Sequence, residues 1–299
     1  MYPTKQPGAG TRYGEKCGNF LILGTAVLWS FLGIFIQEAG VHGLVSSGIT
    51  SLVGAAVLVL CNRRHRFCLN RQTFLAGLIT AGMNLTFFLA NSYTTVTNAI
   101  VLQYCSPIFV LILNIVVCHY RPGRLQVLSL GGCMAGMAVF FLDQLSTGNL
   151  AGNLLALASG LLFAGSFFLN AKGEVDPISS SLLAFLLDAP VGLFYMAASG
   201  GFPSLQSLGL LVLGGIFLRG LAGVLYSRGM RLTTALSANM IALSEVFLAP
   251  LWARLLFHEA LGRYSALGIV LMVSGIVLEC YSEYHTKNLE NSQKKQGMD

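Results

Sequence analysis

The sequence predicts an all-α membrane protein in which ten transmembrane helices form two inverted five-helix repeats. Its 299 residues are 55% hydrophobic and only 10% charged, and the mean hydropathy is +0.70. This composition excludes an ordinary soluble surface. The two halves of the chain also resemble one another, and each half holds five predicted spans. Because five is odd, the second half must cross the membrane in the opposite sense to the first.

The internal repeat shows in short matching segments. Gly18–Leu23 (GNFLIL) recurs in the second half as Gly152–Leu157 (GNLLAL), and His119–Arg124 (HYRPGR) recurs as His258–Arg263 (HEALGR). The second pair of segments lies further apart in sequence than the first pair. This change of offset predicts a five-residue insertion near the seventh or eighth span. Inverted repeats are typical of secondary transporters, whose substrate site lies between the repeats near the bilayer midplane.

The individual spans follow from the length of the apolar segments. A hydrocarbon core about 30 Å thick requires roughly 20 apolar residues per helix. Residues 43–62 contain no charge, and the uncharged stretch 72–118 is long enough for two helices and a turn. Segments such as 21–36 are apolar on every face, which excludes the alternation of a β-barrel strand. The predicted spans are 19–37, 43–61, 73–92, 97–118, 125–142, 150–171, 177–198, 206–227, 234–257 and 264–281.

The positive charges predict the orientation. With a cytoplasmic N-terminus, fifteen of the eighteen Lys and Arg residues face the cytoplasm and only Arg263 lies outside, which is a strong positive-inside bias. The basic run 63–66 is part of this signal, and contact with anionic lipid headgroups is the alternative interpretation. We therefore expect a multi-pass protein of the cell membrane with both termini in the cytoplasm. The net charge of +6 reports orientation, since no nucleic-acid motif accompanies it.

These boundaries divide the chain into five parts. We predict a cytoplasmic N-terminal tail (1–18), a first five-helix repeat (19–142), an outer linker (143–149), a second five-helix repeat (150–282) and a cytoplasmic C-terminal tail (283–299). The polar end of the last part, residues 286–299, is expected to be disordered.

Two short motifs, one in each half, carry a resemblance to a known family. Ser106-Pro107-Ile108-Phe109 opens into an apolar helix, and so does Glu245-Val246-Phe247, with Glu259 at the end of that helix. These motifs resemble the EamA-like family of the drug/metabolite transporter superfamily, which repeats a Glu-Pro-Val-Phe-like mid-helix motif and a later acid. The resemblance covers residues 18–282. The chain departs from the family pattern where Ser106, Tyr120 and Val246 replace the first mid-helix acid, the first terminal acid and the second proline.

The resemblance implies a bundle whose central cavity is lined by spans 1, 3, 4, 6, 8 and 9, with spans 5 and 10 at the periphery. It does not indicate a substrate. The family is one of transporters, so the resemblance implies a carrier.

Three charged residues fall near the centres of predicted spans, namely Asp188, Arg219 and Glu245. A charge at the bilayer centre costs at least about 2.5 kcal/mol on insertion scales, so each should face the protein interior or a wet cavity. One interpretation is a structural network in which an acid neutralises Arg219. The other is functional, because the surplus acid must bind a proton or await a cation. Both hold if Asp188 pairs with Arg219 while Glu245 is the active group.

Polar and aromatic residues supply further candidates for the site. Asn84 lies mid-membrane, where it is available to a substrate or to a neighbouring helix. Tyr104, Trp29 and Phe167 lie on spans that the resemblance assigns to the cavity. Aromatic faces hold cations or stack aromatic substrates, and ordinary packing is the alternative. Pro250 cannot donate a backbone hydrogen bond, so it predicts a loosened helix one turn after Glu245.

Together these features predict a secondary active transporter of a small polar or amphiphilic metabolite, either amino-acid-like or an amine, working by alternating access. An amino-acid substrate is supported more by the family resemblance than by the spacing of the charged residues. We expect an exporter coupled to protons through Glu245. The alternatives are an importer or exchanger of a quaternary amine or other small solute and, in a different class, a membrane-embedded enzyme. Against an enzyme, the sequence shows no Ser/His/Asp set and no His-Glu-x2-His motif at membrane depth.

The expected partners follow from this prediction. They are a small-molecule substrate, protons and membrane lipids, with no nucleic acid, and the protein should be a monomer or a homodimer. We expect no cofactor, because the sequence has no phosphate-binding loop, and no metal, because the seven cysteines form no Cys-x2-Cys or Cys/His cluster.

Overall fold

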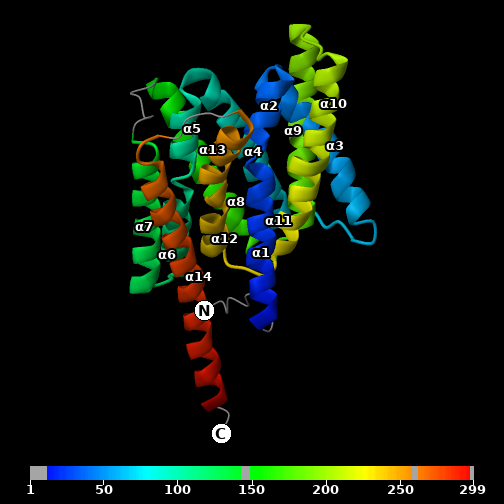
Figure 1. Cartoon of the computed structure of the whole chain (residues 1–299). Helices are drawn as coiled ribbons and strands as arrows, with labels where there is room; N and C mark the ends of the chain where they lie inside the picture. Colours follow the sequence, from blue (N-terminus) through cyan, green and yellow to red (C-terminus); the bar gives the residue numbers. More distant parts are fainter. Residues whose placement is uncertain (1–11, 143–148, 258–261, 297–299) are drawn as a thin grey trace.

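The computed structural model describes residues 12–142, 149–257 and 262–296, and the regular structure within these ranges is entirely helical (Figure 1). The elements in chain order are α1 (Arg12–Trp29), α2 (Leu32–Ala39), α3 (Gly43–Cys61), α4 (Arg71–Tyr93), α5 (Val96–Gln103), α6 (Ser106–Cys118), α7 (Arg124–Phe140), α8 (Leu150–Asn170), α9 (Pro177–Ser199), α10 (Leu205–Gly214), the π-helical η1 (Gly215–Leu221), α11 (Ala222–Met230), α12 (Ala235–Ala242), α13 (Ser244–Phe257) and α14 (Ser265–Gln296).

Most of these helices are suited to cross a membrane. Within the described residues, eight helical stretches are long and apolar enough to do so, while the apolar helices Lys16–Trp29 and Arg124–Phe140 are shorter. Each predicted span coincides with one helix or with two or three consecutive helices. The chain is therefore an all-helical, multi-pass membrane protein, and the number of ten spans stays a prediction.

Three spans predicted as single helices are interrupted. The first breaks at Ser30–Phe31, where the Ser30 hydroxyl donates to the Val27 carbonyl oxygen at 2.6 Å and competes with the helical pattern. The fourth breaks at Tyr104–Cys105, just before Pro107, a residue that helices favour in their first turn. The ninth breaks at Leu243.

The interruption of the ninth span does not lie at Pro250, and loosening of the helix by this proline stays a prediction. Pro250 lies inside the continuous helix α13, and the break lies earlier in the chain, at Leu243. There the Leu243 amide donates to Met240 and the Val246 amide donates to Leu243. These are tight bonds across three residues, so the chain turns without needing a proline.

The helix boundaries of the two halves match in register. The separation in sequence between the starts of α3 and α9 equals that between the starts of α4 and α10. Helices α5 and α12 also correspond, because each contains eight residues and each is capped by a threonine, Thr95 in the first half and Thr234 in the second. The interruptions at Tyr104 and Leu243, which directly follow these two helices, are thus equivalent positions of one repeated unit.

The predicted insertion lies in the eighth span and the link after it. The stretch Leu205–Met230 contains 26 residues, whereas α4 contains 23. Residues 231–233 then precede the capping Thr234, whereas Thr94 alone separates α4 from the capping Thr95. A π-helix winds more residues into each turn than an α-helix. The segment η1 therefore takes up added length without breaking the helix, and it contains Arg219.

Helices α7 and α14 lie side by side at one edge of the bundle, and α14 extends beyond the other helices at the end where α1 begins (Figure 1). The pair is closely packed, because a Cβ on Gly136 would lie 2.7 Å from the Met272 amide nitrogen. The sequence predicts a disordered tail from residue 286, but α14 continues to Gln296. Residues 286–296 contain no glycine or proline and several good helix formers, which allow the helix to continue.

Candidate functional site

Glu245 lies where the interruptions of the fourth and ninth spans meet. It is the second residue of α13, and its carboxylate accepts a hydrogen bond from the hydroxyl of Tyr104, the residue that directly follows α5. Glu245 is half-buried, and the ion pairs among the described residues do not include it. The hydrogen bond between Tyr104 and Glu245 thus joins the helix interruption of the first half to the equivalent interruption of the second half.

Five aromatic rings form a continuous group beside this contact. The Tyr104 ring packs edge-on against Phe163 with centroids 5.8 Å apart, and Phe163 packs against Phe167 at 5.0 Å. Phe167 continues to Tyr226 at 5.4 Å, and Trp29 lies 5.8 Å from Tyr226. Edge-to-face pairs of this kind are favourable and fix the ring positions. The group, hereafter the aromatic wall, brings α1, α8 and α11 together beside Glu245.

A second polar group surrounds Asp188, which is 1% exposed. Its Oδ2 accepts a hydrogen bond from Asn84 Nδ2 at 2.5 Å, and the same oxygen lies 3.9 Å from a terminal nitrogen of Arg219. The other terminal nitrogen of Arg219 donates to Ser47 Oγ at 3.3 Å. These contacts join α3, α4, α9 and η1, so two helices of each half meet here.

This second group keeps two unmatched atoms. Asp188 Oδ1 and Arg219 Nε are both buried without a hydrogen-bond partner among the described residues. An unpaired buried polar atom is costly. One of these two atoms is an acceptor and the other is a donor, so together they suit a ligand or water that offers the complementary pair.

Gly54 provides the space that Arg219 occupies. A Cβ at Gly54 would lie 2.7 Å from the Cβ of Arg219, closer than two such atoms approach. The Arg219 guanidinium also lies 5.9 Å from the centre of the Phe185 ring, within the range of a cation–π contact. The arginine is therefore held by helix packing as well as by its acid.

Comparison with known proteins decides the family. The profile of the EamA-like transporter family matches residues 16–142 and again residues 150–279. The chain belongs to the EamA-like transporter family. The predicted resemblance is thus confirmed, with one family repeat in each half, and the protein is a membrane transporter of the drug/metabolite transporter superfamily.

A comparison of folds agrees with this membership. A solved structure described only as the crystal structure of a protein superposes with a TM-score of 0.78 over 89% of this chain and 96% of that chain. The sequence identity is 17%, so the likeness shows the fold alone. The search of curated proteins found no match to this sequence.

The structure of this EamA-like chain divides the predicted site residues into two groups. Tyr104, Trp29 and Phe167 gather around Glu245, whereas Asn84, Asp188 and Arg219 form the second group. The described structure pairs Arg219 with Asp188, which is the pairing assumed in the interpretation that leaves Glu245 as the active group. The terminal acid Glu259 lies outside the described residues.

Three contributors were not singled out as site residues by the sequence. Phe163 and Tyr226 complete the aromatic wall, and Ser47 bonds Arg219. Phe163 was one of several aromatics on the expected cavity spans, but nothing distinguished it from its neighbours. Ser47 lies in a helix that also contains Ser46 and Ser51, so its role depends on a contact with a residue far away in sequence.

Proposed function

We propose that this EamA-like protein is a secondary active transporter that exports a small amino-acid-like or amine-bearing metabolite in exchange for protons, by alternating access. The proposal is supported most directly by the position and the hydrogen-bond donor of the Glu245 carboxylate. It lies between the two halves, at a helix interruption, and its hydrogen-bond donor is the neutral Tyr104 hydroxyl. An acid without a cationic partner is free to take up a proton or to receive a cationic group, and coupling requires that exchange.

The chemistry around Glu245 supports an amine. The aromatic wall lies beside the negative charge of Glu245, and aromatic rings together with an acid form a combination that binds cations. The unmatched Asp188 Oδ1 and Arg219 Nε add one acceptor and one donor. An amino acid carries an ammonium that donates and a carboxylate that accepts, and arginine suits carboxylates. A quaternary amine would leave Asp188 Oδ1 unmatched, so it is the second candidate.

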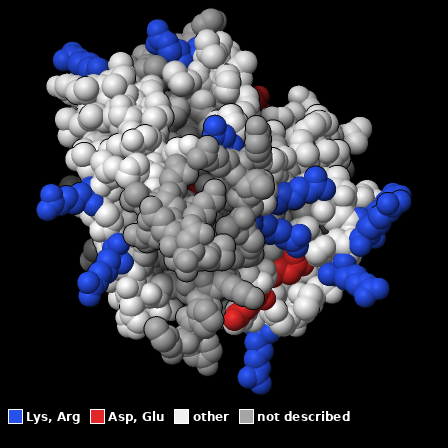
Figure 2. Space-filling model, turned by 90° about the horizontal axis from the view of Figure 1, so that it is seen from below, with Lys and Arg blue, Asp and Glu red and all other residues white. Residues whose placement is uncertain are grey.

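We further propose ten spans in two inverted halves (19–142 and 150–282), with both termini on the cytoplasmic side of the cell membrane. The fifteen-to-one distribution of Lys and Arg supports this orientation. Helix α1 begins and α14 ends at the same end of the bundle. Figure 2 views that end and shows Lys and Arg side chains spread around it, while the two largest patches of Asp and Glu lie at the lower right.

Cysteine labelling in intact cells tests the orientation. Single cysteines at Arg64 and Arg228 should resist an impermeant reagent, and a cysteine at Glu38 should react, in a background without the native cysteines. All three positions are exposed in the structure, so reactivity reports sidedness. Outside labelling at positions 64 and 228 would overturn the proposed orientation.

A ligand screen followed by transport tests the function. Purified protein is first screened by thermal unfolding against amino acids, amines and nucleobases, since a ligand that binds the folded state alone raises the unfolding temperature. The stabilising compound is then followed in proteoliposomes under a pH gradient. We expect it to cross chemically unchanged and to accumulate against its own gradient. Chemical conversion of the compound would instead support a membrane-embedded enzyme.

A further inference from the structure

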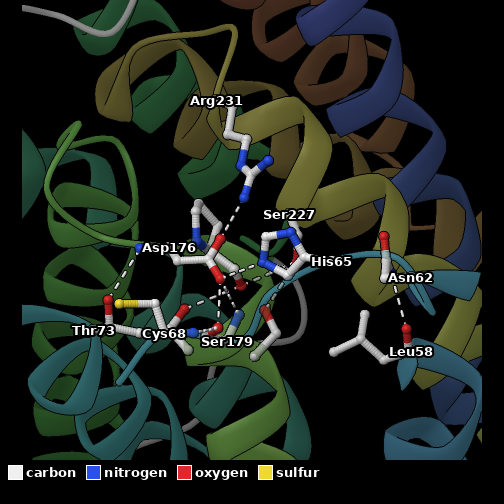
Figure 3. A network of polar contacts seen from close by, with 12 residues as sticks. Leu58, Asn62, His65, Cys68, Thr73, Asp176, Ser179, Ser227 and Arg231 are labelled. Carbon is white, nitrogen blue, oxygen red and sulfur yellow. Dashed lines mark hydrogen bonds and ion pairs between the residues drawn. The ribbon is translucent and has the colours of Figure 1, made fainter. Parts of the chain in front are cut away.

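A cluster of polar contacts centred on Asp176 connects three links at the end of the bundle that is cytoplasmic in the proposed orientation (Figure 3). Asp176 precedes α9 and caps it by accepting from the Ser179 amide at 3.1 Å. The same oxygen lies 2.7 Å from His65 Nε2, and its other oxygen accepts from the guanidinium of Arg231. The Asp176 amide donates to Thr73 Oγ1 at 3.1 Å.

These contacts join the two halves of the chain. His65 belongs to the α3–α4 link in the first half, Asp176 to the α8–α9 link and Arg231 to the α11–α12 link in the second. Two more bonds reinforce the attachment, from the Cys68 amide to Ser179 Oγ at 2.9 Å and from Asn70 Nδ2 to the Glu174 carbonyl oxygen at 2.7 Å. The α3–α4 link is therefore tied to the second half at several points.

The charge at the centre of the cluster is stable at neutral pH. Burial acts to raise the pKa of Asp176, but hydrogen bonds from Ser179, His65 and Arg231 outweigh it and hold that pKa below its usual value. The carboxylate is thus ionised near pH 7, and its bonds are charge-assisted, the stronger class of hydrogen bond. Arg231 is 43% exposed, so water screens and competes for the outer part of the cluster, which keeps it breakable.

The equivalent position at the opposite end is held differently. The counterpart of Asp176 in the first half is His42, which caps α3 as Asp176 caps α9. Its ring stacks on Tyr195, near the end of α9, with centroids 4.4 Å apart. The ion pairs seen among the described residues include neither His42 nor Tyr195. One end of the α3–α9 pair is therefore joined by an ionic cluster and the other by a ring contact.

The three links belong to the helices that carry the candidate site. The α3–α4 link leads into α4, which carries Asn84, and the α8–α9 link follows α8, which carries Phe167. The α11–α12 link joins the helix of Tyr226 to the helix pair of Glu245. Separating these links would separate the ends of the helices around the site.

We propose that the Asp176 cluster is the latch that closes the cytoplasmic entrance and that it opens and re-forms in every transport cycle. This inference rests on the proposed function, because alternating access requires each entrance to close while the other is open. Contacts between charged side chains in short links suit this task, since they break without unfolding a helix.

The latch can be weakened without removing the helix cap. Asp176→Asn removes the charge but keeps a side-chain oxygen, and asparagine caps helices as well as aspartate does. Arg231→Gln removes the other partner and leaves α9 untouched, which provides a second variant if the first folds poorly. The matched control is Arg228→Gln, which removes an exposed positive charge one turn earlier in the same region.

Distances between spin labels at positions 66 and 173, both exposed and on the two joined links, report the state of the latch in lipid nanodiscs. We expect one main short distance in the parent protein. Asp176→Asn and Arg231→Gln should raise the population of longer distances several-fold, and Arg228→Gln should not. The proposal is overturned if both latch variants keep the parent distribution, or if the Arg228 control changes it equally. Because this readout needs no substrate, it is independent of whether proton-driven transport is found.

Discussion

Two carboxylates in the interior of the bundle, Asp188 and Glu245, have opposite surroundings. Asp188 is almost completely buried, lies beside Arg219 and accepts from Asn84. Glu245 is half-buried and accepts from the uncharged Tyr104 hydroxyl. A buried charge depends on its partner, because removing the partner leaves it uncompensated, whereas an acid that has no cationic partner among the described residues is available to a proton or a substrate. From this difference we propose a mainly structural role for Asp188 and a proton- or substrate-exchanging role for Glu245.

The backbone around Asp188 also differs from the backbone around Glu245. Asp188 lies within the continuous helix α9, at a junction of four elements from both halves. Glu245 lies just after the interruption at Leu243, and its partner Tyr104 lies at the equivalent interruption in the other half. A helix break allows one segment to move relative to the other, so Glu245 is placed where movement of the halves changes its surroundings.

The largest expected effect on stability comes from breaking the Asp188–Arg219 pair. Arg219→Met leaves Asp188 as a buried charge without a cation, and breaking such a pair typically costs about 3–5 kcal/mol of unfolding free energy. Chemical unfolding of the purified protein in detergent measures the loss. Adding Asp188→Asn to this variant should restore most of it. A stable single variant would contradict the structural role of the pair.

A smaller effect is expected from the glycine beside Arg219. Gly54→Ala places a Cβ 2.7 Å from the Arg219 Cβ, and overfilling a packed interior typically costs about 1–3 kcal/mol. Gly131→Ala is the control, because its Cβ would meet no atom within 4 Å. Unfolding experiments should show a loss for the first variant and none for the second. Equal stability of the two proteins would show that Arg219 does not depend on Gly54.

The smallest change in stability is expected on the side of Glu245. Tyr104→Phe removes the hydroxyl that donates to the carboxylate but keeps the ring in the aromatic wall. A lost hydrogen bond of this kind costs about 0.5–1.5 kcal/mol, so the protein should remain folded. Initial rates in proteoliposomes should fall under a pH gradient, while gradient-free substrate exchange should change less. Unchanged rates would remove Tyr104 from the coupling step.

Hydropathy located the spans because a membrane helix needs an apolar stretch of fixed length, and that stretch is visible in the sequence. It did not locate the interruptions at Ser30–Phe31 and Leu243, since a turn of one or two residues leaves the hydropathy unchanged. Only the break before Pro107 had a sequence signal, and no interruption lies at Pro250.

The charged residues of the site could be predicted from the sequence for a similar physical reason. A charge at mid-membrane is costly, so it indicates a structural or functional requirement. Their partners were less visible. Asn84 was a candidate by depth alone, and Ser47 was indistinguishable from neighbouring serines. His65 and Asp176 lie in different halves of the chain, so their contact follows from how the links approach one another and not from any local pattern.

The most direct test of the central claim is proton-driven transport by Glu245→Gln, measured beside Asp188→Asn in proteoliposomes with the substrate found by the ligand screen. Glutamine keeps the size and hydrogen bonding of Glu245 but cannot exchange a proton. We expect the Glu245 variant to remain folded, to retain gradient-free exchange and no longer to accumulate substrate under a pH gradient. For Asp188→Asn we expect a loss of stability. A stable Glu245→Gln protein that accumulates substrate as well as the parent does would show that Glu245 does not carry the coupling proton.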